Sequence, residues 1–257
     1  MKRKLRSITS KIWSCSAIVL ILIVWQIVSA TGLVDSFMLP SPLSVVRAFI
    51  IEFPTLMEHA MVTLAEAFIG LSLGIVLGFI MAVFMDQFRG LYKAFYPLII
   101  LTQTIPTVAI APLLVLWFGY EMTPKVILIV ITTFFPITVG LLNGFQSADK
   151  DSINLLRAMG AGRWQIFRYI NFPGALSQFF AGLRISASYA VVGAVISEWL
   201  GGFGGLGVYM TRVKKAFSFD KMFAVIFLIS LISLLLMKGV DLLQKKCMPW
   251  ENLGQEE

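Results

Sequence analysis

Long apolar runs alternate with short polar segments along this chain of 257 residues. A helix needs roughly 20 predominantly apolar residues to cross a membrane, because the hydrocarbon layer is about 30 Å thick. The pattern therefore predicts an all-α polytopic membrane protein with six transmembrane helices and both termini on the same side. The six predicted spans cover approximately residues 12–33, 59–85, 95–118, 125–145, 175–199 and 223–243.

The first apolar stretch has two interpretations. Val28-Ser29-Ala30 resembles the small-residue cleavage site of a secretory signal peptide. The stretch is longer than the core of about 7–15 residues that is typical of such peptides, which favours an uncleaved membrane anchor. In residues 39–53, which follow, prolines precede apolar residues at helical spacing. We expect a short amphipathic helix there, lying at the outer membrane interface.

The second apolar stretch carries glycine at every fourth position, at Gly70, Gly74 and Gly78. This spacing places the three glycines on one helix face, where a neighbouring helix can approach closely. Glu66 lies on the same stretch, and a carboxylate at membrane depth costs about 3 kcal/mol unless it faces protein or water. We expect the glycines to serve helix packing and Glu66 to point into the protein.

The third apolar stretch contains three prolines and carries an amide and a hydroxyl side chain near its middle. Carbonyl groups freed by proline at membrane depth are tolerated only against protein or a water-filled cavity. The stretch is therefore predicted to line a translocation pathway, although a kinked packing helix is the alternative. The residues assigned to this pathway are Gln103, Thr104, Pro106 and Pro112, together with Ser197 and Glu198 at the end of the fifth stretch.

The longest polar segment between apolar stretches covers residues 146–174. Its apolar residues fall at three-residue spacing with arginines between them, and glycines interrupt the pattern. We expect two short helices joined by a bend at Gly160-Ala161-Gly162, with Asp149 and Asp151 supplying acceptors for the first helix N-terminus. Such a hairpin could enter a groove on a soluble partner, or it could rest on anionic lipid.

Composition and charge support this topology. The chain is 58% hydrophobic and 14% charged, whereas soluble domains carry about a quarter charged residues. Five of the basic residues precede the first apolar run, which favours cytoplasmic N- and C-termini over an arm that binds nucleic acid. With this orientation, fifteen of the 21 Lys and Arg residues lie on the cytoplasmic side and six outside. The basic residues at 212–221 go against the rule.

The polar segment resembles the cytoplasmic signature of the membrane subunits of bacterial ABC importers. In that signature, E-A-A is followed after three residues by Gly and after nine more by I-x-L-P. Asn154-Leu155-Leu156 occupies the E-A-A positions, Gly160 the glycine, and Ile170-Asn171-Phe172-Pro173 the I-x-L-P positions. The acidic residue is therefore absent, as is any charge contact it makes with the ATPase. The frame of helix, glycine, helix and proline is retained.

This resemblance covers roughly residues 58–243 and implies a type I ABC importer transmembrane fold in the bacterial cytoplasmic (inner) membrane. It divides the chain into an N-terminal region (1–57) with the first transmembrane helix and the interfacial helix, a transmembrane domain (58–243) with a coupling hairpin (149–174), and a cytoplasmic tail (244–257). The hairpin residues implied to couple to the ATPase are Asn154, Leu155, Leu156, Met159, Gly160, Ala161, Gly162, Trp164, Phe167, Ile170 and Pro173.

The resemblance also implies partners: cytoplasmic ABC ATPase subunits, an extracytoplasmic substrate-binding protein and a second copy of the permease, which forms a homodimer. The chain is expected to be embedded in the lipid bilayer and not to bind nucleic acid. The sequence contains no G-x-x-x-x-G-K-[ST] motif, so ATP hydrolysis is expected on a partner and the chain is expected to be non-catalytic. No cofactor or metal is expected. An ion-coupled secondary transporter would need intramembrane charge relays and an internal repeat, and a membrane enzyme would need a nucleophile or a metal cluster.

Segments such as TIPTVAIAPLLVLWFG and SEWLGGFGGLGVYM are similar to a subgroup of these permeases that serves nitrate, taurine, aliphatic sulfonates and thiamine-precursor pyrimidines. The second segment is most similar to the pyrimidine branch. We therefore expect a small polar or heteroaromatic substrate such as a thiamine-precursor pyrimidine, with nitrate, taurine or aliphatic sulfonates as the alternative.

Residues 201–207, GGFGGLG, contain the pattern G-x-G-x-x-G. In soluble enzymes this pattern binds a dinucleotide pyrophosphate at a helix N-terminus, after a β-strand. Here it follows an apolar helix, and the charge count places it on the outer face. We predict that the match is accidental and that the glycines let the chain turn sharply after Glu198 and Trp199, as an outer-gate loop.

Overall fold

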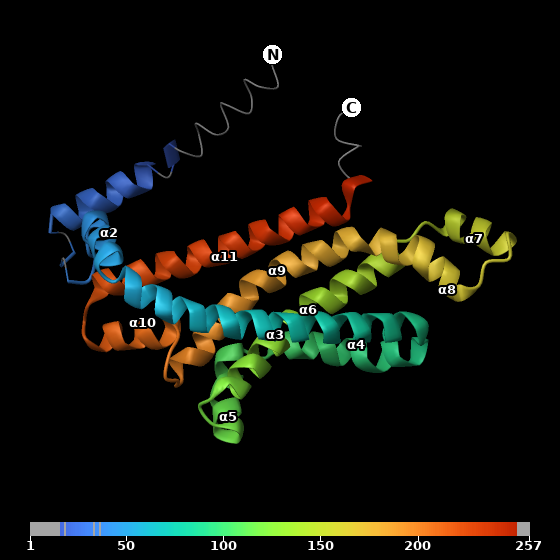
Figure 1. The fold of residues 1–257 in the computed structure, drawn as a ribbon, viewed down its shortest axis with the longest axis horizontal. Coiled ribbons are helices and arrows are strands. Elements are labelled where there is room, and N and C mark those ends of the chain that lie inside the picture. Colours follow the sequence, from blue (N-terminus) through green and yellow to red (C-terminus); the bar gives the residue numbers. More distant parts are fainter. Residues whose placement is uncertain (1–15, 18, 33, 36, 251–257) are drawn as a thin grey trace, which may run out of the picture. The chain divides into compact units, whose positions relative to one another are not determined.

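The computed structural model describes residues 16–17, 19–32, 34–35 and 37–250, and within these residues it contains helices and no β-strand (Figure 1). Helix Val19–Ala30 is the described part of the first predicted span, whose beginning lies outside the described residues. The remaining elements are α2 (Pro42–Ile51), α3 (Phe53–Gln87), α4 (Arg89–Thr104), α5 (Thr107–Phe118), α6 (Met122–Gln146), α7 (Lys150–Ala158), α8 (Arg163–Ile166), the π-helix η1 (Phe167–Asn171), α9 (Phe172–Trp199), α10 (Leu206–Lys215) and α11 (Phe219–Cys247).

The predicted all-α polytopic architecture is confirmed. In the described part of the chain, four helical segments are long and apolar enough to cross a membrane: Phe53–Gln87, Met122–Gln146, Arg163–Trp199 and Phe219–Cys247. The bent pair α4 and α5 together would make a fifth. The first predicted span, 12–33, stays a prediction, because only its portion Val19–Ala30 is described as a helix.

The third predicted span is wrong as a single helix. α4 and α5 meet at an angle of 98°, and Figure 1 shows α5 turning away from the direction of α4. The break falls at Ile105-Pro106, where a proline pushes the preceding residue out of the α-helical region; Ile105 accordingly has φ −85° and ψ 121°. Pro97 and Pro112 remain inside α4 and α5, so only one of the three prolines breaks the span.

Three further boundaries differ from the sequence prediction. The segment left between the second and third predicted spans is reduced to Phe88, because α3 and α4 extend into it. A helix that was not predicted, α10, follows the glycine loop. The second hairpin helix is not a separate short helix, since α8 and η1 continue into α9 as one segment, Arg163–Trp199. Pro173 does not end this segment, because it follows the π-helix η1, a local departure from the α-helical hydrogen-bond pattern at which the missing N–H of proline is accommodated.

The chain forms two compact units, one from residues 1–58 with 209–228 and one from residues 59–208 with 229–257. In the first unit, Glu52 at the end of α2 accepts hydrogen bonds from Lys221 and Tyr209. The hydrogen bond and charge of Lys221 lower the pKa of Glu52, whereas burial and the Glu52 carboxylate raise the pKa of Tyr209. These contacts connect α2, α10 and α11 within this unit.

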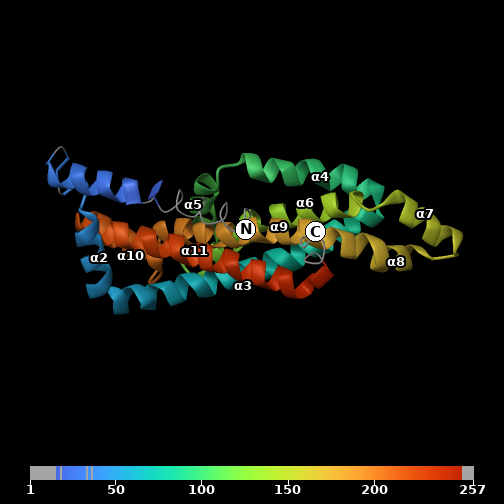
Figure 2. The ribbon, with the colours of Figure 1, turned by 90° about the horizontal axis from the view of Figure 1, so that it is seen from above.

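In the second unit, α6 and α9 pack along each other, as Figure 2 shows. Glycines allow this approach: a Cβ on Gly182 would lie 2.4 Å from the carbonyl oxygen of Pro136. The glycines of α3 face α6 in the same way, and a Cβ on Gly74 would lie 2.2 Å from the hydroxyl oxygen of Thr133. Gly70 and Gly78 meet the side chains of Ile129 and Ile137, so all three α3 glycines lie against one face of α6.

Candidate functional site

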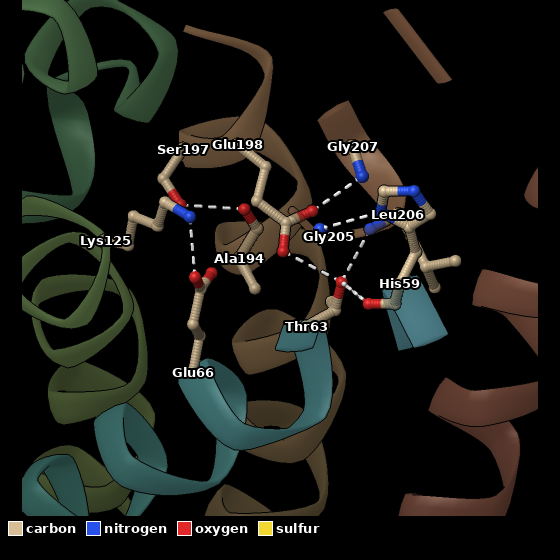
Figure 3. A network of polar contacts seen from close by, with 10 residues as sticks. All are labelled: His59, Thr63, Glu66, Lys125, Ala194, Ser197, Glu198, Gly205, Leu206 and Gly207. Carbon is tan, nitrogen blue, oxygen red and sulfur yellow. Dashed lines mark hydrogen bonds and ion pairs between the residues drawn. The ribbon is translucent and has the colours of Figure 1, made fainter. Parts of the chain in front are cut away.

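A buried cluster of polar groups joins α3, α6 and α9 to the glycine loop (Figure 3). At its centre is Glu198, which is 1% exposed. Its Oε1 accepts a hydrogen bond of 2.8 Å from the hydroxyl of Thr63, and its Oε2 accepts one of 2.6 Å from the backbone N–H of Gly207. The end of α9 is therefore fastened both to α3 and to the beginning of α10.

The beginning of α10 obtains its hydrogen-bond acceptors from other helices. The first backbone N–H groups of any helix lack partners within the helix. Here three consecutive groups, those of Gly205, Leu206 and Gly207, donate to His59 Nδ1, Thr63 Oγ1 and Glu198 Oε2. The positive end of the α10 dipole also favours the negative charge of Glu198.

The glycines of the loop are required by this arrangement. Gly205 has φ +114°, which side-chain-bearing residues rarely adopt, and a Cβ there would lie 2.2 Å from the carboxylate of Glu198. A Cβ on Gly207 would lie 2.4 Å from the carbonyl oxygen of Val195, and one on Gly201 would lie 2.3 Å from the ring of Tyr120. The loop therefore turns sharply after Trp199, as predicted, and its glycines make room for a carboxylate of the protein itself.

A buried ion pair lies beside this cluster. Lys125 Nζ is 2.6 Å from Glu66 Oε1, and the two side chains are 6% and 4% exposed. Glu66 points inward as expected, and Lys125, which the charge count assigned to the outer side of the membrane, is buried near the beginning of α6. The second oxygen of Glu66 has no hydrogen-bond partner among the described residues.

The break between α4 and α5 opens onto a cavity of about 260 Å³. It lies between the ends of the two half-helices and the facing sides of α6 and α9. Two residues predicted to line the pathway, Gln103 and Pro106, are in its wall. Its lining residues are Gln103, Ile105, Pro106, Thr107, Thr132, Tyr189, Val192, Gly193 and Ile196.

The other predicted pathway residues lie elsewhere. Thr104 is next to the cavity but donates to the carbonyl of Leu101 in its own helix. Ser197 is buried and donates to the carbonyl of Ala194, and Glu198 is the centre of the buried polar cluster described above. Pro112 lies inside α5. The six residues are therefore divided between the cavity, the end of α4 beside it, α5, and the end of α9.

The hairpin is shaped by a glycine at the end of α7. Gly160 has φ +84°, and the backbone N–H groups of Gly160 and Ala161 donate to the carbonyls of Arg157 and Leu156. This is the Schellman arrangement that ends a helix with a left-handed residue. A Cβ on Gly160 would meet no atom within 4 Å, so there is room for a side chain. Glycine is favoured at this position by the positive φ alone.

Side chains also cap both hairpin helices. The carboxylate of Asp149 accepts from the backbone N–H groups of Asp151 and Ser152 at the start of α7. The hydroxyl of Ser152 donates to the same carboxylate, and these bonds lower the pKa of Asp149. Asp151 itself lies in the first helical turn. At the start of α8, Gln165 accepts from the N–H of Gly162.

Most of the hairpin residues that resemble the coupling signature are exposed, and Figure 1 shows the turn at which α7 leads into α8. Leu155, Met159 and Trp164 are 64%, 74% and 66% exposed. Phe167 is buried and stacks on Trp164. Asn154, Gly160 and Gly162 are also exposed, and the partly buried members are Leu156, Ala161, Ile170 and Pro173.

Residues 74–248 match the family model described as "Binding-protein-dependent transport system inner membrane component". The chain belongs to this family. It is a multi-pass permease component of an importer in the bacterial inner membrane. The permease is 37% identical to the formylaminopyrimidine transport permease protein ThiX of Halalkalibacterium halodurans, over 90% of this chain and 92% of that protein. It is 35% identical to the riboflavin transport system permease protein RibX of Chloroflexus aurantiacus, over 91% of this chain and 88% of that protein.

Solved structures agree on the fold. An amino acid ABC transporter chain aligns with a TM-score of 0.65 and 17% identity, covering 77% of the permease and 96% of that chain. The MetNI methionine ABC transporter aligns with a TM-score of 0.66 and 20% identity, covering 74% and 95%. The type I importer fold that the resemblance implied is therefore confirmed.

Several residues of the permease escaped sequence reasoning. Thr63 and His59 are one helical turn apart on α3, but only the folded chain shows that α10 begins beside them. Thr107, Thr132 and Tyr189 come from three different helices and meet only at the cavity. The one local signal available was the run of small and hydroxyl residues around Tyr189 on α9, which indicates a close helix approach.

Proposed function

We propose that this permease imports an uncharged heteroaromatic solute of the thiamine-precursor pyrimidine class. The observation that carries the proposal is the order of identity among its relatives. Permeases named for formylaminopyrimidine and riboflavin are 37% and 35% identical to it. Two permeases named for aliphatic sulfonates are 27% and 29% identical, and one named for taurine is 28% identical.

Transport is proposed to be driven by ATP that a separate subunit hydrolyses. The hairpin supports this role, because its exposed apolar side chains at Leu155, Met159 and Trp164 present knobs to a complementary groove. We assign the cytoplasmic side to the hairpin, in keeping with the excess of Lys and Arg there. The partners are then a pair of ATPase subunits, an extracytoplasmic substrate-binding protein and a second copy of the permease.

The loop at 201–207 is proposed to close the passage on the outer side. Its backbone is held by side chains of α3 and α9, so opening requires exchanging those hydrogen bonds for water or for other partners. The glycines of α3 are proposed to act in helix packing, and the kinked α4–α5 segment is proposed to line the passage.

The proposal is tested by uptake into proteoliposomes that contain the permease, its ATPase and its binding protein. We expect ATP-dependent accumulation of radiolabelled formylaminopyrimidine and no competition by a hundredfold excess of taurine. Accumulation of taurine instead would assign the permease to the sulfonate branch. Accumulation that persists without the ATPase would contradict an ABC importer altogether.

A further inference from the structure

We propose that the cavity at the α4–α5 break is a recognition site for the solute in transit, and that it selects uncharged planar molecules through Gln103, Thr107 and Tyr189. The proposal rests on the proposed function in that it takes the solute to be a heteroaromatic ring. It goes further by placing part of the selectivity in the permease itself and by naming the groups that supply it.

The first argument is the state of the polar side chains around the cavity. Thr102 and Thr104, which flank Gln103 in α4, both donate back to carbonyls of their own helix. Thr132 on the opposite wall donates to the carbonyl of Ile129. Polar side chains in a membrane span ordinarily find such partners, because unsatisfied groups are expensive in hydrocarbon.

Three exposed or partly exposed groups on the same cavity are not committed in this way. The amide of Gln103, the hydroxyl of Thr107 and the phenol of Tyr189 make no hydrogen bond to any other part of the chain that the structure describes. They come from the end of α4, the beginning of α5 and the middle of α9, and they line one cavity. Uncommitted donors and acceptors that meet at one cavity are available to a polar ligand.

The second argument is charge. The described lining consists of amide, hydroxyl, phenol and aliphatic groups, all of them neutral. Sulfonates and nitrate are anions, and no cationic side chain of the described residues lines the cavity to offset their desolvation, so only the partial positive charge at the N-terminus of α5 would favour them. An aminopyrimidine ring has neutral donors and acceptors at its edge, which an amide and two hydroxyl groups can match.

The third argument is size and shape. Pockets for drug-sized ligands measure about 300–1,000 Å³, and this cavity, at about 260 Å³, suits a single substituted ring. Tyr189 is 46% exposed and lines the cavity, while Val192 and Ile196 on the same helix form part of its apolar wall. An aromatic solute can stack on Tyr189 while its edge reaches Gln103 and Thr107.

The test measures direct binding of radiolabelled formylaminopyrimidine to the permease–ATPase complex in lipid nanodiscs, without the binding protein. We expect saturable binding, with taurine at the same concentrations failing to compete. Gln103→Leu and Thr107→Val should each weaken binding about three- to tenfold, as expected for one lost hydrogen bond. Tyr189→Leu should weaken it more than Tyr189→Phe, since phenylalanine keeps the stacking face.

Thr102→Val is the matched control, because this threonine is on the same helix turn but bonds to its own helix and does not line the cavity. It should leave binding unchanged, and all variants should keep the elution profile of the intact complex. The proposed site would be overturned if the variants Gln103→Leu, Thr107→Val and Tyr189→Leu all bound the pyrimidine with wild-type affinity. If pyrimidine uptake were also normal, the proposed function would still stand. Taurine uptake without pyrimidine uptake would overturn the proposed function, and taurine binding weakened by the same variants would overturn the selection for uncharged solutes.

Discussion

The carboxylate of Glu198 joins three segments that are far apart in the sequence. It accepts from Thr63 on α3 and from Gly207 on α10 while standing at the end of α9. If a buried carboxylate loses such partners, the free-energy cost of removing it from water is no longer offset. That cost is larger than the net stabilisation that one hydrogen bond contributes. Small changes around Glu198 should therefore have large effects.

Gly205→Ala is predicted to destabilise the permease. The new Cβ would overlap the Glu198 carboxylate, and the φ of +114° would be strained in alanine by about 1–2 kcal/mol. We expect the midpoint of thermal unfolding in detergent to fall by at least ~4 °C. Gly239→Ala in α11 serves as the control, because a Cβ there meets no atom within 4 Å. Equal midpoints for the two variants would contradict the prediction.

The Glu66–Lys125 pair gives a second prediction at this scale. Lys125→Met leaves Glu66 buried without a counter-charge and should destabilise the permease by about 3–5 kcal/mol. The double variant Glu66→Leu with Lys125→Met removes both charges and should recover most of the loss. The yield of monodisperse protein and its unfolding midpoint, measured for both singles and the double, provide the check. A double variant less stable than either single would show that the pair acts differently.

The sequence predicted the burial of only one member of this ion pair, Glu66. The inward orientation of Glu66 follows from the cost of a carboxylate at membrane depth, which is a property of the residue and its helix alone. Its partner depends on how α3 and α6 are aligned, and that alignment is set by the contacts of Gly70, Gly74 and Gly78 with α6. Lys125 near the start of an apolar run is indistinguishable in sequence from an interfacial lysine.

At the scale of elements, the hairpin contains two glycines with different roles. Gly160 ends α7 with a positive φ, whereas Gly162 precedes α8 with φ −75°, which any residue can adopt. Neither glycine is crowded, as a Cβ on Gly162 would approach only the side chain of Gln165, at 3.7 Å. The two positions therefore separate the effect of backbone conformation from that of side-chain volume.

Gly160→Val is predicted to lower ATP-driven uptake while the ATPase subunits continue to hydrolyse ATP, because valine strains the left-handed turn that orients the hairpin. Gly160→Asn should retain more uptake, since asparagine tolerates this conformation better. Gly162→Ala should behave like the wild-type protein. The ratio of solute transported to ATP hydrolysed in proteoliposomes measures the effect, and a normal ratio in Gly160→Val would remove the hairpin turn from the coupling step.

Proline illustrates what the sequence can and cannot predict at this scale. Pro97, Pro106, Pro112 and Pro173 all interrupt apolar or helical patterns, but only Pro106 coincides with a break. A proline inside a helix is tolerated where neighbouring helices support the freed carbonyl groups, and that support is a tertiary property. The bend at Gly160 was predictable because a helix-ending glycine acts through its own backbone.

At the scale of the whole molecule, the orientation across the membrane can be tested with two exposed positions. After replacement of Cys15 and Cys247, Phe203→Cys in the glycine loop should react with a membrane-impermeant maleimide in intact cells. Met159→Cys at the hairpin tip should react only after permeabilisation. The native residues are 88% and 74% exposed, so reagent access is not limited by burial. The opposite labelling pattern would invert the proposed topology.

The class of the molecule was accessible from its sequence because it depends on quantities that add along the chain. Three such quantities can be read from short stretches of sequence without knowing the fold. They are the length of each apolar run, the number of basic residues in each connecting segment, and the spacing of residues around Gly160. The cavity depends on Tyr189, and the polar cluster around Glu198 depends on Thr63 and Gly207. The groups of each site meet only through the packing of helices that are distant in sequence.

The continuity of α8, η1 and α9 has a mechanical consequence. These elements form one segment of 37 residues, Arg163–Trp199, which is about 55 Å long at 1.5 Å per residue. Such a segment can act as a lever arm, with the hairpin turn just before one end and Glu198 near the other. A tilt of about 5° over that length displaces one end relative to the other by about 5 Å. A displacement of that size exceeds the reach of the bond between Glu198 and Gly207, so one rigid body could relay a push at the hairpin to the loop that we propose closes the passage.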